Sequence, residues 1–229
     1  MRTARCQEMT PFGRADWLIP AGLIALSAIP TFAGVVRVVQ LAVGAEIAPE
    51  SARLFAAPVP VLLHIFSSVI FVALGAVQFS PGVRRRHPDW HRRAGFMLVP
   101  CGLVAALAGM WIAHLHPIGI DPPGSFDGPF VYATRLVAGA AMALSLCLGF
   151  AAIRRREIPP QRAWTLRACA LGIGAGTQVL VQLPWYMLPG MHGEIARTLF
   201  MATAWAVNLA VAEWLISSER RQRVAAWAR

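Results

Sequence analysis

Six apolar stretches, each long enough to cross a lipid bilayer as a helix, dominate this sequence. They cover residues 17–44, 60–81, 94–114, 130–153, 164–185 and 194–217. About 20 apolar residues in a helix span the hydrocarbon core of a membrane. Only 14% of the 229 residues are charged, whereas soluble domains are about one quarter charged because their surfaces face water. We therefore predict an all-α fold, in which residues 1–229 form a single bundle of about six transmembrane helices.

Arginine is distributed unevenly among the segments that connect these stretches. The segments before the first stretch and after the second, fourth and sixth stretches are rich in it. Their arginines are Arg2, Arg5, Arg14, Arg84, Arg85, Arg86, Arg92, Arg93, Arg154, Arg155, Arg156, Arg162, Arg220, Arg221, Arg223 and Arg229. The other three connections contain only Arg53. Because cytoplasmic loops of membrane proteins are enriched in basic residues, this alternation predicts cytoplasmic termini and a location in the bacterial cytoplasmic membrane.

The same loops account for the formal net charge of +10. The positive charge lies in short clusters between apolar stretches, at the level where lipid headgroups are expected. The predicted partners are therefore the lipid bilayer and the anionic headgroups of its cytoplasmic face. Nucleic acid is not an expected partner.

Short polar motifs mark the ends of several stretches. They are Leu63-His64, Gly75 with Gln78-Phe79, His91-Arg92 with Gly95, and Gln161-Arg162 with Trp164-Thr165 and Arg167. In these residues the chain resembles a bacterial family of predicted multi-helix membrane proteins that is known only as a domain of unknown function. The resemblance covers residues 58–190. The family pattern has histidine at Gln161 and methionine at Thr165, so a metal or haem site shared by the family's two inner histidines would lack one ligand here.

Five basic side chains on five different helices are predicted to lie near the outer ends of the bundle. They are Arg37, His64, His114, Arg135 and Arg197. Charged or titratable groups inside a bilayer are costly, which makes them candidates for function. If they converge, they form a cationic pocket suited to a carboxylate, a phosphate, a haem propionate or a lipid headgroup. Alternatively, each arginine reaches the surface or pairs with Glu46, Asp127 or Glu194.

A second polar cluster is predicted at the inner ends of the helices. Its members are Gln78, His91, Arg92, Gln161, Arg162 and Arg167. His91 could act as a ligand or titrate near neutral pH, whereas Arg92 and Arg162 could simply anchor helices at the interface. Glu213 on the last helix is expected near the inner boundary, paired with an arginine.

Helical periodicity indicates which faces point into the bundle. One face of the second stretch carries His64, Ser68, Phe71, Gly75 and Gln78. A stripe on the third stretch carries Gly95, Gly102 and Gly109, which would let neighbouring helices approach closely. In the fifth stretch, the segment from Gly172 to Gly176 is the best candidate for a helix interruption.

The sequence is compatible with three functions. The sequence contains no P-loop, His-Glu-x-x-His, Cys-x-x-Cys or Gly-x-Ser-x-Gly motif, which favours a non-catalytic accessory or ligand- or lipid-binding membrane protein. Buried arginines, inward glutamines and a weak repeat between the two central arginine loops would suit a small-solute transporter. His64 and His114 could instead be the axial metal ligands of a b-type haem, or part of a quinone site, in a redox protein.

Overall fold

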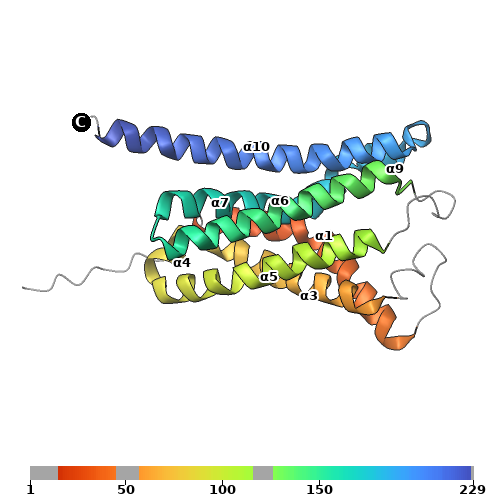
Figure 1. Cartoon of the computed structure of the whole chain (residues 1–229), viewed down its shortest axis with the longest axis horizontal. Coiled ribbons are helices and arrows are strands. Elements are labelled where there is room, and N and C mark those ends of the chain that lie inside the picture. Colours follow the sequence, from red (N-terminus) through yellow and green to blue (C-terminus); the bar gives the residue numbers. More distant parts are fainter. Residues whose placement is uncertain (1–14, 45–56, 116–125, 228–229) are drawn as a thin grey trace, which may run out of the picture.

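A computed structural model describes residues 15–44, 57–115 and 126–227, and within these ranges the chain is all helix, with no strand. Five long helices run side by side along the molecule (Figure 1). They are α1 Ala15–Val43, α3 Pro58–Gln78, α5 Pro88–His114, α6 Pro129–Arg154 and α10 Glu194–Trp227. The shorter elements are α4 Pro81–Arg86, α7 Ile158–Gly172, α8 Gly174–Val181, α9 Leu183–Met187 and a 3₁₀ turn, Pro189–Met191. The structure confirms the predicted all-α fold.

The same five long helices are each long and apolar enough to cross a membrane. Their bounds agree with five of the six predicted stretches, except that α5 begins at Pro88 and α10 continues to Trp227. Hydropathy does not detect the first turns of α5 because they are polar. Pro88 and Asp89 nevertheless favour a helix start, since proline needs no hydrogen bond in the first turn and an aspartate there complements the helix dipole.

The sixth predicted stretch, residues 164–185, is divided among α7, α8 and α9, and none of these is long enough to span a bilayer alone. The first interruption is at Ile173, inside the segment predicted from its glycines. Two side chains of α10 bind the carbonyl groups next to it. Trp205 Nε1 donates to the Leu171 oxygen at 3.2 Å, and Asn208 Nδ2 donates to the Ala170 oxygen at 3.0 Å. An interrupted helix is tolerated in a membrane when neighbours satisfy its backbone in this way.

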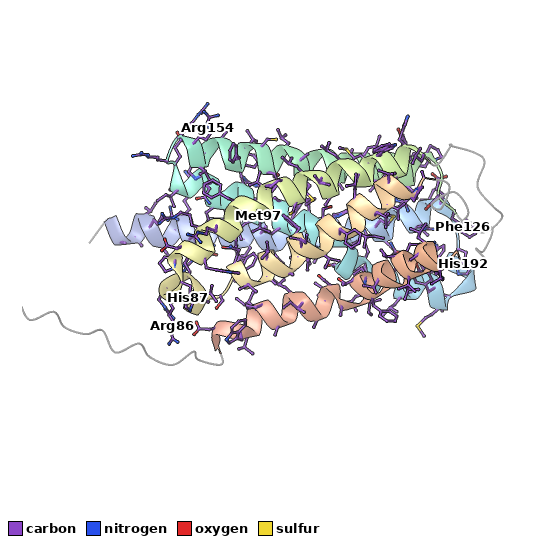
Figure 2. All side chains as sticks on the ribbon, turned by 90° about the horizontal axis from the view of Figure 1, so that it is seen from below. Arg86, His87, Met97, Phe126, Arg154 and His192 are labelled. Carbon is purple, nitrogen blue, oxygen red and sulfur yellow. The ribbon has the colours of Figure 1, made fainter. Side chains whose placement is uncertain are left out.

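The arginine loops gather at one end of the bundle. Figure 2 shows Arg86 and Arg154 at this end, which we call the arginine end, and Phe126 and His192 at the opposite or far end. An ion pair of 3.5 Å between Arg85 and Asp16 joins α4 to the start of α1 at the arginine end. The alternating arginine pattern is therefore matched by alternating helix direction.

Small residues allow the helices to pack tightly around a buried core. The core cluster consists of Phe71, Leu98, Ala106, Met142, Leu146, Ala168, Cys169 and Leu171. A Cβ on Gly102 would lie 2.7 Å from side-chain atoms of Phe71 and Leu146, so this glycine is required for the packing. The predicted stripe fails at Gly95, where a Cβ would meet nothing within 4 Å, because the neighbouring Ala94 is buried there instead.

Candidate functional site

A cavity of about 910 Å³ lies between the helices in the far half of the bundle. Near the far end it is lined by charged groups: Arg37, Asp127, Arg135 and Arg197. Deeper, its walls are apolar and aromatic: Phe71, Met142, Leu171, Gly172 and Trp205. Arg37 and Ser27 both line it and are ten residues apart on α1, which corresponds to a depth of about 15 Å at the rise of an α-helix. The cavity therefore changes from charged to apolar along its length.

Two guanidinium groups converge on one carboxylate at the charged end. Arg135 donates from both terminal nitrogens to Asp127, at 3.0 and 3.2 Å. Arg197 approaches the same carboxylate at 3.1 Å. Its guanidinium carbon also lies 5.4 Å from the centre of the Trp185 ring. We call Asp127, Arg135 and Arg197 the charged triad; within it, two positive groups share a single negative one.

The local backbone places Asp127 directly before α6. Phe126 has a φ of 49°, in the left-handed region, which turns the chain into the helix start. Glu194, at the start of α10, accepts a hydrogen bond of 2.7 Å from the Phe130 backbone N–H in the first turn of α6. A Cβ on Gly128 would collide with that carboxylate, so only glycine permits this approach. Of the three acidic partners considered for the arginines, the structure places Asp127 on Arg135 and Arg197 and Glu194 on the α6 backbone, while Glu46 lies outside the described residues.

His64 reaches the same cavity from α3. Its Nδ1 lies 2.8 Å from the Ala105 carbonyl oxygen. Because a carbonyl can only accept, Nδ1 carries the proton and Nε2 is left as an acceptor in the neutral ring. A Cβ on Gly109 would lie 3.2 Å from the imidazole, so this glycine makes room for it. Four of the five predicted outer residues thus line one cavity: Arg37, His64, Arg135 and Arg197.

The fifth outer residue, His114, is not among the cavity-lining residues. Its Nδ1 lies 3.1 Å from the hydroxyl of Tyr132 on α6, and the side chain is exposed. The structure therefore does not bring His64 and His114 together as an axial pair. Within the described residues, no group of three or more His, Cys, Asp or Glu side chains is arranged to hold a metal ion.

Three further cavity residues carry buried polar atoms without a hydrogen-bond partner among the described residues. They are Ser27 Oγ, Gln178 Nε2 and Trp185 Nε1. None of these three residues is among the site residues predicted from the sequence. The one sequence signal for Ser27 as a cavity residue was that it is a lone serine in an apolar stretch. Trp185 gave no such signal, because a tryptophan at that position is also typical of a membrane interface.

The predicted inner cluster is divided among separate helix contacts. Arg162 forms an ion pair with Glu219, and Arg167 binds Glu213 through two of its nitrogens, so both side chains attach α7 to α10. The latter contact confirms the predicted arginine partner of Glu213. Gln78 Nε2 donates to the His91 backbone oxygen at 3.0 Å and joins α3 to α5.

The two remaining members of the inner cluster do not add to a shared site. Arg92 is exposed, and the Gln161 backbone oxygen accepts a bond of 2.9 Å from Thr165 within α7. The Arg167 guanidinium also lies 4.5 Å above the ring of Trp164. These contacts hold helices together at the arginine end.

Comparison with known proteins identifies the family. A family model described as "Predicted membrane protein (DUF2306)" matches residues 61–216. The match extends beyond the predicted limit of residue 190 and includes much of α10. No curated protein and no solved structure matches the chain. Since the matched segment is more than half of the sequence, the chain belongs to the DUF2306 family of predicted membrane proteins, whose function is unknown.

Proposed function

We propose that this chain is a non-catalytic ligand-binding protein of the bacterial cytoplasmic membrane, and that its cavity binds an amphipathic anion. The observation that carries the proposal is the gradient along the cavity. The charged triad lies at one end, and apolar side chains line the other end: Met142 is seven residues beyond Arg135 on α6, which corresponds to about 10 Å. A cavity of about 910 Å³ has the size of a site for a small amphipathic molecule.

The proposed topology has six crossings, with the arginine end in the cytoplasm. α7, α8 and α9 together form the crossing that none of them completes alone. The common location of Arg86 and Arg154 at one end supports this arrangement, because basic residues are enriched on the cytoplasmic side. The mouth of the cavity then faces the outer leaflet. Labelling of single cysteines placed at 86, 154 and 192 in intact cells tests this topology. Labelling of 154 but not 86 from outside would refute it.

The charged triad supplies the proposed headgroup site. A guanidinium has five N–H donors, and Arg135 uses two of them for Asp127. It can therefore bind a second acceptor without releasing the first. Arginine suits carboxylates and phosphates because its planar donors match pairs of oxygens.

The apolar part of the cavity supplies the proposed tail site. Phe71, Met142 and Leu171 line the deep part and also belong to the core cluster, which is packed between the cavity and the arginine end. The structure therefore has a pocket that ends inside the bundle. This arrangement supports binding more directly than passage.

Native mass spectrometry of the gently purified chain tests the proposal. We expect a retained anionic lipid or fatty acid, and saturable rebinding of oleate after delipidation. Arg135→Gln should weaken oleate binding about tenfold or more, because a charge-assisted hydrogen bond is lost. Arg135→Lys should be intermediate, and Arg154→Gln, an exposed position at the other end of α6, should be neutral. Equal oleate binding by all four proteins would contradict the proposal.

A small-solute transporter is the second candidate, and one observation favours it. Gly172 and Gly176 flank the interruption at Ile173 and also line the cavity, so a discontinuous helix meets the proposed ligand. Ligand-dependent flux in proteoliposomes would support transport, whereas binding without flux would leave the first proposal in place.

The b-type haem or quinone alternative has less support. His64 is the one histidine among the described cavity-lining residues, so a two-histidine haem would lack its second ligand there. A Soret band in the purified protein that disappears in His64→Ala would restore this alternative.

A further inference from the structure

Two neutral cavity side chains whose donors have no hydrogen-bond partner among the described residues are almost fully buried. Ser27 is 4% exposed and Trp185 is 7% exposed, and Gln178 is half-buried. Their Oγ, Nε1 and Nε2 atoms find no acceptor among the described residues. Buried donors are nearly always hydrogen-bonded in folded proteins. Acceptors inside the cavity are the simplest way to satisfy these donors.

Ser27 and Gln178 lie at the same depth. A Cβ on Gly176 would be 2.5 Å from the Leu26 carbonyl oxygen, so α1 and α8 touch at this level. Both helices run from the arginine end toward the far end. Ser27 is one residue beyond that contact and Gln178 is two, which places them within about 1.5 Å of each other along the bundle axis. We call Ser27 and Gln178 the deep donor pair.

Trp185 lies higher in the cavity, next to the charged triad. It is seven residues beyond Gln178, or about 10 Å toward the far end at the rise of a helix. Its ring is the one that lies 5.4 Å from the Arg197 guanidinium carbon. The cavity thus offers donors at two levels: cationic and indole N–H groups near the mouth, and a neutral hydroxyl and amide in the deep part.

We infer that the amphipathic anion is an acyl ester, whose acidic headgroup binds at the charged triad and whose ester carbonyl binds the deep donor pair. This inference rests on the proposed function and specifies its ligand class. A carbonyl oxygen accepts two hydrogen bonds, which matches one hydroxyl and one amide. An unsubstituted alkyl chain would leave both donors unsatisfied. In a monoacyl glycerol phosphate, the glycerol backbone separates the phosphate from the ester carbonyl, so the two groups can bind at different depths of the cavity.

Two probes that differ in one oxygen test the inference. The first is monoacyl glycerol phosphate, and the second is the alkyl ether of the same chain length, which has the same headgroup but no carbonyl. Isothermal titration of the full-length chain in detergent should show the acyl lipid binding about tenfold more tightly, the effect expected for satisfying buried donors. Gln178→Leu and Ser27→Ala should each remove most of that preference.

The ether lipid also serves as the folding control. Its ether oxygen is a weaker acceptor than a carbonyl, so its affinity should change much less than that of the acyl lipid in a correctly folded Gln178→Leu variant. Gln182→Leu provides a matched substitution four residues away, at a buried position that does not line the cavity, and should keep the preference. If Gln178→Leu does not fold, the smaller change Ser27→Ala decides the test.

The two possible failures have different signatures. If neither lipid binds, the proposed function is wrong. If both bind equally to the wild-type chain, the charged cavity is supported, but the deep donors are satisfied by water and the acyl-ester inference is overturned. A preference for the acyl lipid that survives both substitutions would also overturn it.

Discussion

The two halves of this bundle are built differently, although both are made of the same apolar helices. Toward the arginine end, Phe71, Leu98 and Leu146 belong to a continuous packed core, and a Cβ on Gly102 would already collide with it. Toward the far end, the helices enclose a cavity of about 910 Å³ with charged and polar side chains on its wall. One half is filled and the other is left open.

The contrast shows which polar groups serve packing. In lipid there is little hydrophobic drive between helices, so their association depends on close van der Waals contact and on satisfied polar groups. At the arginine end, Arg162 and Arg167 bind carboxylates on α10, although Arg162 Nε and His91 Nδ1 are buried without a hydrogen-bond partner among the described residues. In the far half, Ser27 and Gln178 do not find such partners among the described residues. An open, partly unsatisfied region at this cost is typical of a binding site.

The largest effect on stability is expected from a large-to-small substitution in the core cluster. Phe71→Ala should lower the free energy of unfolding by about 3–5 kcal/mol, because a buried ring of the core cluster is lost and the cavity whose deep wall it forms becomes larger. Phe66→Ala on the same helix is the matched control, since Phe66 is 57% exposed and Phe71 only 3%. Thermal unfolding in detergent measures both. Equal losses would mean that the core cluster is not the tightly packed region.

Adding a side chain inside the packed half should lower the free energy of unfolding by a smaller amount. Gly102→Val should lower the free energy of unfolding by about 1–3 kcal/mol. Its Cβ would lie 2.7 Å from side-chain atoms of Phe71 and Leu146, so both side chains must move. Gly95→Val, on the same helix with nothing within 4 Å, should be nearly neutral. The same thermal measurement applies. A destabilised Gly95→Val would show that the first turns of α5 have a partner beyond the bundle.

In the open half, removing the shared carboxylate should separate stability from binding. Asp127→Asn should lower the unfolding free energy by about 1–2 kcal/mol, because charge-assisted bonds to Arg135 and Arg197 are weakened. The affinity for oleate should rise severalfold, because the competing negative charge is gone. Asp16→Asn, a pair with the exposed Arg85, should change neither quantity much. Weaker oleate binding by Asp127→Asn would mean that Asp127 orients the arginines for the ligand.

The smallest effect on stability should come from filling the cavity. Ser68→Leu adds volume to the cavity wall, so the unfolding free energy should change by less than about 1 kcal/mol while oleate binding weakens. Ser67→Leu is the contrasting neighbour: Ser67 is buried outside the cavity and donates to the Leu63 backbone oxygen. It should destabilise the chain without that selective loss. Similar results for both serines would remove the distinction between the two halves.

Much of the fold could be predicted from the sequence because lipid imposes a strict rule on helix length and composition. The five long helices and the grouping of the arginine loops follow from that rule. The start of α5 could not be found this way, since Pro88 and Asp89 are helix-start residues in a polar segment. The interruption at Ile173 was indicated by Gly172 and Gly176, but its extent depends on which neighbours reach the freed carbonyl groups.

The candidate site was predictable in part for the same reason. Arg37, His64, Arg135 and Arg197 were detectable because charge is rare in lipid, and all four line the cavity. His114 does not line the cavity, although its predicted depth is similar. Its side chain lies toward Tyr132, and depth along the helix does not show which neighbour a side chain contacts. The deep donor pair could not be recognised, because a serine or glutamine is not informative until the structure shows that it lacks a partner.

The interruption at Ile173 also has a consequence for biogenesis. α7 leaves the ribosome before α10, yet the Leu171 and Ala170 carbonyl groups depend on Trp205 and Asn208 of α10. Until α10 is synthesised, the broken segment would leave those groups without these partners. If α7, α8 and α9 form the proposed fifth crossing, its stable insertion should therefore depend on synthesis of α10, and the two should leave the translocon together as a hairpin.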